Sequence, residues 1–247
     1  MSDTFKKYDG VVDRLSKKIG YSQSRVPGFI IGLSGTDSIV AFDALYSAMQ
    51  NHWREERMLG IHYVDRVDKS HGSFDTIAIP WMREKYPKAT FLVAEPLGGN
   101  HDQQRWADLH SRALHTLHAG GGRSPLPPEE TYWIAGAMNA TEAALGKYTI
   151  LANAVSIQPI RSLWKAEVLE ISEKLGVPAK IIANSRIPDC LCGRDDLAAE
   201  NIELIDDILR ARYDPTQHDV VLLKKLLEYV RINQEDNGFR TRIPYRV

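Results

Sequence analysis

The sequence is poor in cysteine, has no long apolar run and carries no excess of one charge. Its only cysteines are Cys190 and Cys192, which excludes a disulfide framework and makes the reducing cytoplasm the expected location. No uninterrupted apolar stretch approaches the roughly 20 residues that span a bilayer, and the polar N-terminus lacks the apolar core of a signal peptide. The 31 basic and 32 acidic side chains leave a net charge of −1, so neither a membrane nor a nucleic acid is an expected partner.

The hydrophobic fraction of 43% in 247 residues is enough for a large core, and its pattern alternates between two periods. Short apolar runs typical of buried strands lie at residues 29–33, 58–64, 90–94 and 132–136. The remaining pattern predicts helices over 4–19, 39–50, 74–86, 101–118, 140–146, 163–175, 197–210 and 218–233. Alternating strands and helices indicate right-handed βαβ units in a doubly wound, mostly parallel α/β sheet with a helical C-terminal section. We expect one domain spanning residues 1–247.

The end of the first predicted strand carries the clearest functional signal. Ligands of such sheets bind beyond the carboxyl ends of the strands, so the loops after Leu33, Tyr63 and Gly136 are expected to matter. The first of these loops reads Ser34-Gly35-Thr36-Asp37-Ser38. Its small residues let backbone N–H groups turn inward, and the next helix adds unpaired amides and the positive end of its dipole. This arrangement is typical of a phosphate site; the alternative is an ordinary helix cap made by a Ser or Asp side chain.

This loop resembles the S-G-G-x-D-S signature of the PP-loop ATP pyrophosphatases, which split ATP between the α and β phosphates. The resemblance implies a Rossmann-like fold of the adenine-nucleotide α-hydrolase type, in which the loop holds pyrophosphate and the Asp helps to coordinate Mg²⁺. The present chain reads S-G-T-D-S, one residue shorter. Its loop therefore supplies one backbone amide fewer to a phosphate.

A second region is similar to the ammonia-dependent NAD synthetases. Residues 136–149 (GAMNATEAALGKYT) resemble that family's G-T-x-N-K-S-E…L-G-Y-F-T segment, and 158–168 (QPIRSLWKAEV) resemble its P-I-x-x-L-Y-K-T-x-V. Residues 175–178 match L-G-V-P, 200–209 resemble the E…Y-x-x-I-D-x-x-L helix, and 240–244 resemble the K-R-x-P-P ending. Arg112 weakly matches an Arg of the family's A-R-x-R-M helix. The resemblance is densest over 136–178.

Carried over by position, the resemblance implies a ligase that uses ATP and Mg²⁺. Asp37 and Glu142 would hold Mg²⁺, a hard cation that prefers carboxylates and phosphate oxygens. Lys165 would stabilise the charge that builds as pyrophosphate leaves. Asp37, Glu142 and Lys165 are thus the predicted catalytic residues; without the resemblance, Glu142 and Lys165 also fit ordinary solvated helix charges. The predicted nucleotide-binding residues are Gly32, Ser34, Gly35, Thr36, Asp37, Ser38 and Lys165.

The implied reaction joins a substrate carboxylate to AMP, releases pyrophosphate and lets ammonia displace AMP to form an amide. The family's substrate is deamido-NAD, but several substrate-side positions differ here. The acidic G-D-G-x-x-D run is replaced by 152–156 (ANAVS), G-T-x-N by 136–139 (GAMN), and P-[ST]-A by 188–190 (PDC). The sequence therefore does not identify the acid whose carboxylate is activated. Because no glutaminase region is present, we expect ammonia to be free or supplied by a separate protein, and by resemblance we expect a homodimer.

Two other functions are alternatives to this ligase. One is a different PP-loop activity, such as modification of tRNA or of a deazaguanine. A tRNA substrate calls for a basic face, and the net charge of −1 argues against it. The other is a module that binds ATP or AMP without turnover, which the shortened loop motivates.

Other polar clusters give weaker signals. The C-x-C pair has no partner cysteines, so neither a zinc site nor sulfur transfer is expected. Residues 119–130 (AGGGRSPLPPEE) lack a Walker lysine and predict a surface loop. Of three histidines on one predicted helix, those at 115 and 118 share a face and could bind a metal as a pair, although partly exposed helix histidines are commoner. Three C-terminal arginines fit either phosphate contacts or a solvated tail. These residues are His110, His115 and His118, and Arg240, Arg242 and Arg246.

Overall fold

The computed structural model describes residues 2–21, 28–64, 74–95, 101–115, 132–187 and 196–242. Within these residues four strands form one sheet: β1 (Gly28–Leu33), β2 (Met58–Tyr63), β3 (Thr90–Ala94) and β4 (Tyr132–Ala135). Their order is β3-β2-β1-β4, and every neighbouring pair is parallel. The predicted parallel α/β sheet is confirmed.

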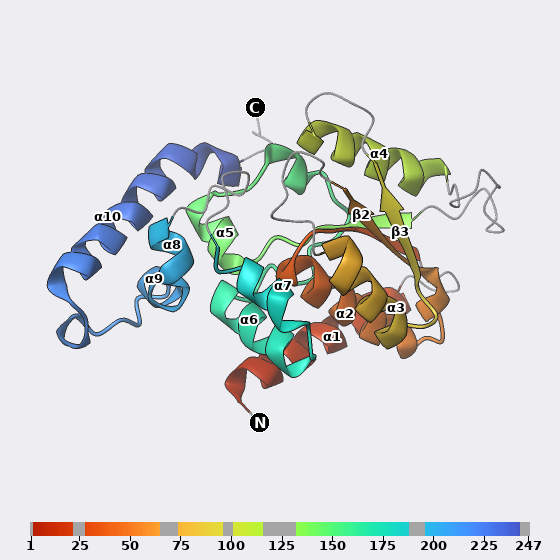
Figure 1. The fold of residues 1–247 in the computed structure, drawn as a ribbon, viewed down its shortest axis with the longest axis horizontal. Helices are drawn as coiled ribbons and strands as arrows, with labels where there is room; N and C mark the ends of the chain where they lie inside the picture. Colours follow the sequence, from red (N-terminus) through yellow and green to blue (C-terminus); the bar gives the residue numbers. More distant parts are fainter. Residues whose placement is uncertain are drawn as a thin grey trace.

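The sheet is covered on both faces. Because successive side chains of a strand point to opposite sides, Phe29 and Ile31 of β1 lie in one apolar cluster and Ile30 lies in another. The first cluster contains residues of α1 (Asp3–Tyr21), α2 (Thr36–Gln50), α3 (Ile79–Lys85) and α6 (Lys165–Lys174), and the second contains residues of α4 (His101–His115). Figure 1 shows α4 above the sheet and the other four helices below it. Burial on both faces explains why β1 and β2 are apolar along most of their length.

The strand order creates a switch point between β1 and β4. From β1 the chain continues to β2 and β3 on one side, and then passes through α4 to β4 on the other side of β1. In β1, Ile31 is in register with Gly60 of β2 and with Ala135 of β4. The segments that begin at Ser34 and Gly136 therefore leave the same edge of the sheet, where ligands of open α/β sheets bind.

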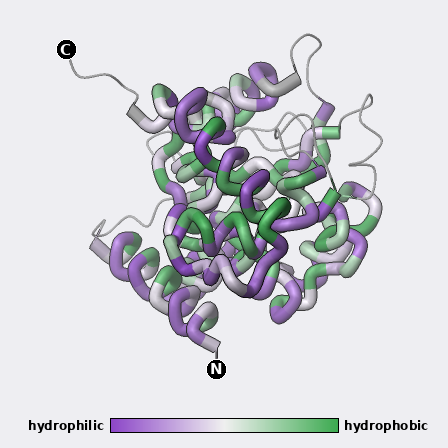
Figure 2. Tube along the Cα trace, turned by 90° about the vertical axis from the view of Figure 1, so that its left-hand side faces the viewer, coloured by the Kyte–Doolittle hydropathy of each residue, from purple (hydrophilic) through white to green (hydrophobic). Residues whose placement is uncertain are grey.

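The C-terminal part adds a helical layer beside the sheet. The helices α5 (Ala140–Leu145), α8 (Asp196–Glu200), α9 (Ile202–Leu209) and α10 (Val220–Asn237) share an apolar cluster of their own. In Figure 1 the helices α8 to α10 lie together at one end of the molecule. In Figure 2 apolar segments gather toward the middle of the molecule, and the outer helices show hydrophilic turns. The predicted helical C-terminal section is confirmed.

Left-handed glycines end two of the helices that frame the site. Gly176 follows α6 with φ 74°, and its N–H donates to the carbonyl of Glu173. Gly146 caps α5 with φ 68°, and a Cβ at this position would lie 2.5 Å from the Cβ of Asn237 in α10. Only glycine fits both demands at position 146 without strain.

Several predicted boundaries are wrong. The helix expected from 39 begins three residues earlier at Thr36, so the expected five-residue loop is mostly the first turn of α2. The helix expected over 197–210 is interrupted at Asn201, which separates α8 from α9. α7 (Ala179–Asn184) was not expected. The predicted helix 74–86 begins with the π-helical turn η3 (Phe74–Ala78) before α3. The 3₁₀ turns are η1 (Glu55–Arg57), η4 (Ile150–Asn153), η5 (Pro215–Gln217) and η6 (Gly238–Arg242).

Some predictions lie outside the described residues. These are the segment 119–130, the residues Cys190, Cys192, His118 and Arg246, and the loop after β2 from residue 65 to 73. Among the described residues, no helix is both long and apolar enough to cross a bilayer.

Candidate active site

The end of β1 and the first turn of α2 form the centre of the candidate site. Ser34 is exposed and Gly35 is the N-cap of α2, with an extended backbone. The Ser38 hydroxyl accepts the N–H groups of Ser34 (2.9 Å) and Gly35 (3.2 Å) and donates to the Gly35 carbonyl (2.8 Å). These two amides point to one oxygen atom. An anionic oxygen at a helix N-terminus would accept hydrogen bonds from them in the same way.

Two glycines leave room beside this loop. A Cβ built on Gly32, the fifth residue of β1, would meet no atom of the described residues within 4 Å, and the same holds for Gly35. Gly60 on the neighbouring strand is different, because a Cβ there would lie 2.6 Å from Leu33 and 2.9 Å from Phe91. Gly60 therefore serves packing, whereas Gly32 and Gly35 border space at the carboxyl end of β1 that none of the described residues fills.

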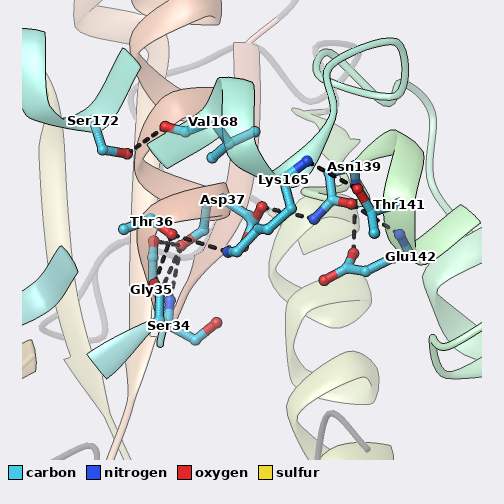
Figure 3. Close-up of polar contacts among 12 residues, drawn as sticks. Ser34, Gly35, Thr36, Asp37, Asn139, Thr141, Glu142, Lys165, Val168 and Ser172 are labelled. Carbon is cyan, nitrogen blue, oxygen red and sulfur yellow. Dashed lines mark hydrogen bonds and ion pairs between the residues drawn. The ribbon is translucent and has the colours of Figure 1, made fainter. Parts of the chain in front are cut away.

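Lys165 and Asp37 form a salt bridge across the switch point. Lys165 is the first residue of α6, and its ammonium bonds to Asp37 Oδ2 and lies 3.1 Å from Thr36 Oγ1 (Figure 3). The side chain of Lys165 is 10% exposed and that of Asp37 is 19% exposed. The structure thus brings together two predicted catalytic residues that are 128 positions apart.

Asn139 connects Asp37 to Glu142. Its side-chain amide donates to Asp37 Oδ1 (2.8 Å), and its side-chain oxygen accepts the Glu142 N–H (2.9 Å). Its own N–H donates to Glu142 Oε2 (3.4 Å), which completes a capping box at the start of α5. Asn139 is fully buried. Glu142 therefore has a structural role at the α5 N-terminus. Asn139 also links its carboxylate to that of Asp37, because Asn139 donates a hydrogen bond to each.

The Thr36 side chain points into the protein rather than toward the open space. Thr36 is fully buried, and its hydroxyl contacts both the Lys165 ammonium and the Ser185 hydroxyl, which is 2.8 Å away. Of the predicted nucleotide-binding residues, Ser34 and Gly35 carry the loop amides and Ser38 accepts them. Asp37 contacts Lys165, and Gly32 precedes the loop on β1. Thr36 instead accepts a hydrogen bond from the Lys165 ammonium on the buried side of the site.

Asp206 is a buried acid next to the site to which no sequence motif gave a role. Its carboxylate accepts the hydroxyl of Thr141 and, at 2.8 Å, the N–H of Ala166. Asp206 is 1% exposed, and burial raises its pKa to about 6 although these hydrogen bonds and Arg210 oppose the rise. The signal that could have revealed it is an acid on the apolar face of α9, between Ile205 and Ile208.

His62 is a second polar residue at the site that no sequence motif indicated. It lies in β2 beside the end of β1, is buried, and its Nδ1 donates to the Leu33 carbonyl at 2.9 Å. Its ring packs on Phe74 with centroids 4.8 Å apart. A histidine inside an apolar strand pattern was the available signal. Its contact supports the residue immediately before Ser34.

The other candidates occupy ordinary structural positions. Arg112, which weakly matched the family, donates to Asp108 on its own helix, and Asp108 also accepts the Tyr63 hydroxyl. Arg240 donates to the Tyr148 carbonyl at 2.6 Å, which ties the chain after α10 to the segment after α5. His110 packs against Trp106 of the same helix. Among the described residues, no group of three or more His, Cys, Asp or Glu side chains is placed to hold a metal ion.

Comparisons with known proteins show what this chain is similar to. A family model described as NAD synthase matches residues 128–239. An NH(3)-dependent NAD(+) synthetase from Methanosarcina mazei is 25% identical over 239 residues, covering 90% of this chain and 88% of the relative. The structure of an NMN synthetase from Francisella tularensis has a TM-score of 0.71 at 18% identity and covers 100% of this chain and 99% of that chain.

A second solved structure, an NH3-dependent NAD synthetase from Campylobacter jejuni, has a TM-score of 0.61 at 18% identity, with 100% of both chains covered. At these identities the solved structures show a common fold. Together with the sequence matches, they confirm that this chain is similar to the ammonia-dependent NAD synthetases along most of its length.

Proposed function

We propose that this chain is a diverged member of the NAD synthase family and an ATP-dependent ligase that converts a carboxylate into an amide. The observation that carries the proposal is the Lys165–Asp37 salt bridge beside the Ser34–Gly35 amides at the switch point of the sheet. An anionic phosphate chain would find an ammonium group there, and two backbone N–H groups that would turn from the Ser38 hydroxyl to a phosphate oxygen. Sequence similarity over most of the chain supports the same assignment.

The chemistry follows from the poor reactivity of a carboxylate toward ammonia. A carboxylate oxygen attacks the α-phosphorus of ATP, the bond between the α-phosphorus and the bridging oxygen breaks, and pyrophosphate leaves. Ammonia then adds to the acyl carbon, loses a proton, and AMP departs with the electron pair of the acyl–oxygen bond. Lys165 stabilises the negative charge that builds on the leaving pyrophosphate. Because binding and charge neutralisation do most of this work, the site needs no protein nucleophile.

The residues near the loop fit a magnesium ion in their chemistry. Asp37 accepts the side-chain amide of Asn139 and Glu142 accepts its backbone N–H, so both carboxylates contact the same buried residue. Mg²⁺ takes one or two carboxylates together with phosphate oxygens and water. We assign Asp37 and Glu142 to hold it. When bound, it would neutralise charge on the ATP phosphates.

Family similarity indicates the type of substrate, a carboxylate, but not its identity. Deamido-NAD is the substrate if the family function is kept. The segment 152–156 (ANAVS) has no acidic side chain, whereas the family pattern has acidic residues there. The acid that corresponds to nicotinamide mononucleotide is the second substrate to test, since the related fold includes an NMN synthetase.

We propose in addition that the ligase is a cytoplasmic homodimer of single-domain chains that accepts free ammonia or ammonia from a separate protein. Light scattering of the purified chain measures the oligomeric state directly. A monomer at working concentration would contradict this part of the proposal.

Pyrophosphate release tests the ligase. The purified chain is mixed with ATP, Mg²⁺ and ammonia and with one carboxylate at a time: deamido-NAD, nicotinic acid mononucleotide, or a panel of other acids. We expect one acid to release pyrophosphate and to yield its amide by mass spectrometry. Lys165→Ala should lower the turnover by about 100-fold or more, the usual effect of removing one charge-stabilising group.

The matched control is Lys180→Ala, which removes an exposed lysine of α7 and should leave the turnover unchanged. No release above background with any acid would contradict the ligase. Binding of ATP or AMP without release would then favour the nucleotide-binding module.

A further inference from the structure

Asp206 reaches the site from a part of the fold remote in sequence. It lies on α9 and faces the first turn of α6, 40 residues earlier in the chain. One carboxylate oxygen accepts the N–H of Ala166 at 2.8 Å, and the other accepts the hydroxyl of Thr141 in α5. A single buried carboxylate therefore joins α5, α6 and α9.

Thr141 extends this contact to Lys165. The Thr141 hydroxyl oxygen accepts the backbone N–H of Lys165 at 2.9 Å while its proton is donated to Asp206. Two of the N-terminal N–H groups of α6 thus end on Asp206, one directly and one through Thr141. Both Asp206 and Thr141 are buried, so in this position neither donor can be satisfied easily by water.

The start of α6 has only half of the usual local cap, because Glu167 accepts the N–H of Trp164 at 2.9 Å while no local side chain accepts the N–H groups of Lys165 and Ala166. Its N-cap is Trp164, and within the described residues this side chain makes no capping hydrogen bond. A serine, threonine, aspartate or asparagine at that position would normally accept the N–H groups of the first turn. Asp206 supplies the missing acceptor from another helix, and its negative charge lies at the positive end of the α6 dipole.

We infer that Asp206 is a positioning residue, which through Thr141 and Ala166 holds the first turn of α6 so that the Lys165 ammonium meets Asp37 and Thr36. The catalytic meaning of this placement rests on the function proposed above. The placement itself is a property of the fold and is measurable without turnover.

Packing alone does not require an acid at this position. α9 already buries Ile202, Ile205 and Ile208, and an apolar residue would join that face at no desolvation cost. Burial instead raises the pKa of Asp206, with Glu167 adding to the rise and Arg210 opposing it. An acid kept at such a position, bonded at both oxygens to the turn that carries Lys165, fits a role in placing that turn.

The test measures the accessibility of Lys165 in three variants. Asp206→Asn keeps the shape but replaces one acceptor with a donor, and Thr141→Val removes the bridging hydroxyl. Thr141→Ser keeps the hydroxyl and removes only the methyl group. Brief acetylation with acetic anhydride, followed by peptide mass spectrometry, gives the labelling rate of Lys165 relative to the exposed Lys180. Circular dichroism at the same temperature shows that each variant is folded.

We expect Lys165 to be labelled about tenfold faster in Asp206→Asn and in Thr141→Val, which corresponds to about 1.4 kcal/mol. Thr141→Ser should label at close to the wild-type rate. Asp207→Asn, the same substitution at the next and partly exposed position of α9, is the matched control and should change nothing. With an active carboxylate substrate, the first two variants should lower kcat by a similar factor and leave KM for the carboxylate unchanged.

Wild-type labelling of Lys165 in folded Thr141→Val would overturn the inference, and this variant decides the outcome if Asp206→Asn does not fold. A lower melting temperature with unchanged Lys165 labelling would assign Asp206 a purely structural role. If labelling changes as expected but the wild-type chain releases no pyrophosphate, the positioning role stands and the proposed ligase function fails.

Discussion

At the scale of single residues, the site depends on a nearly buried pair of opposite charges. Lys165 and Asp37 have little contact with solvent, and each has further polar partners: Thr36 for the ammonium and Asn139 for the carboxylate. Taking such charges out of water costs free energy that their attraction only partly offsets. A pair of this kind is weak evidence for stability, and better evidence for a function that needs both charges.

This view predicts a non-additive pair of substitutions. Asp37→Asn leaves the Lys165 ammonium without its counter-charge and should lower the free energy of unfolding by about 2–4 kcal/mol. Lys165→Met in the same background removes the stranded charge and should recover most of that loss. Pyrophosphate release should stay at least about 100-fold below wild type in both single variants and in the double variant. Urea unfolding of all four proteins measures the coupling, and strictly additive losses of stability would contradict it.

At the scale of elements, the carboxyl end of β1 differs from the adjacent strand by what surrounds its glycine. Gly32 borders open space, whereas Gly60 in β2 lies against Leu33 and Phe91. The two positions are both strand glycines in neighbouring strands. The comparison of these two positions therefore distinguishes Gly32, which leaves room for a ligand, from Gly60, which leaves room for core side chains.

Gly32→Ala should preserve stability and damage nucleotide binding. We expect its free energy of unfolding to change by less than about 1 kcal/mol, and its affinity for ATP to fall by about tenfold or more because the methyl group enters the space assigned to the nucleotide. Gly60→Ala is the matched control and should lose about 1–3 kcal/mol of stability through overpacking while the folded protein binds ATP normally. Urea unfolding and titration calorimetry measure both effects; wild-type ATP affinity in Gly32→Ala would exclude this space as the nucleotide site.

At the scale of the whole molecule, the C-terminal helices have their own apolar cluster but share polar contacts with the site. Leu226 of α10 is fully buried in that cluster. Asp206 and Thr141 connect the same helices to α6, and Lys165 connects α6 to the β1–α2 loop. Because these contacts cross between the clusters, we expect the sheet and the C-terminal helices to unfold together as one domain.

Leu226→Ala tests this cooperativity. The cavity should lower the free energy of unfolding by about 2–5 kcal/mol, in a single transition whose dependence on urea concentration is unchanged. Leu227→Ala, at the neighbouring exposed position, should change the free energy by less than about 0.5 kcal/mol. A separate early transition in Leu226→Ala, seen by circular dichroism before the tryptophan signal changes, would show that the C-terminal helices form an independent unit.

The sequence by itself was sufficient for most of the strands and helices, because the period of apolar residues is a local property of the chain. The runs at 29–33 and 90–94 agree with β1 and β3, and the helix expected to end at 175 ends at Lys174. The sequence predicted helix starts least accurately. Ser34 to Ser38 are compatible with a loop or with a helical turn, and the extended backbone of Gly35 places the start of α2 at Thr36.

Only the tertiary structure decided which polar groups meet. Lys165 finds Asp37 because β1 lies beside β4, and because α6 packs on the same face of the sheet as α2. Asp206 acts on α6 because a Trp164 N-cap leaves its first turn without a local acceptor and α9 packs close enough to supply one. Hydrophobic period records which face of an element is buried, but not which element covers it. Partners distant in sequence therefore follow from strand order and helix packing.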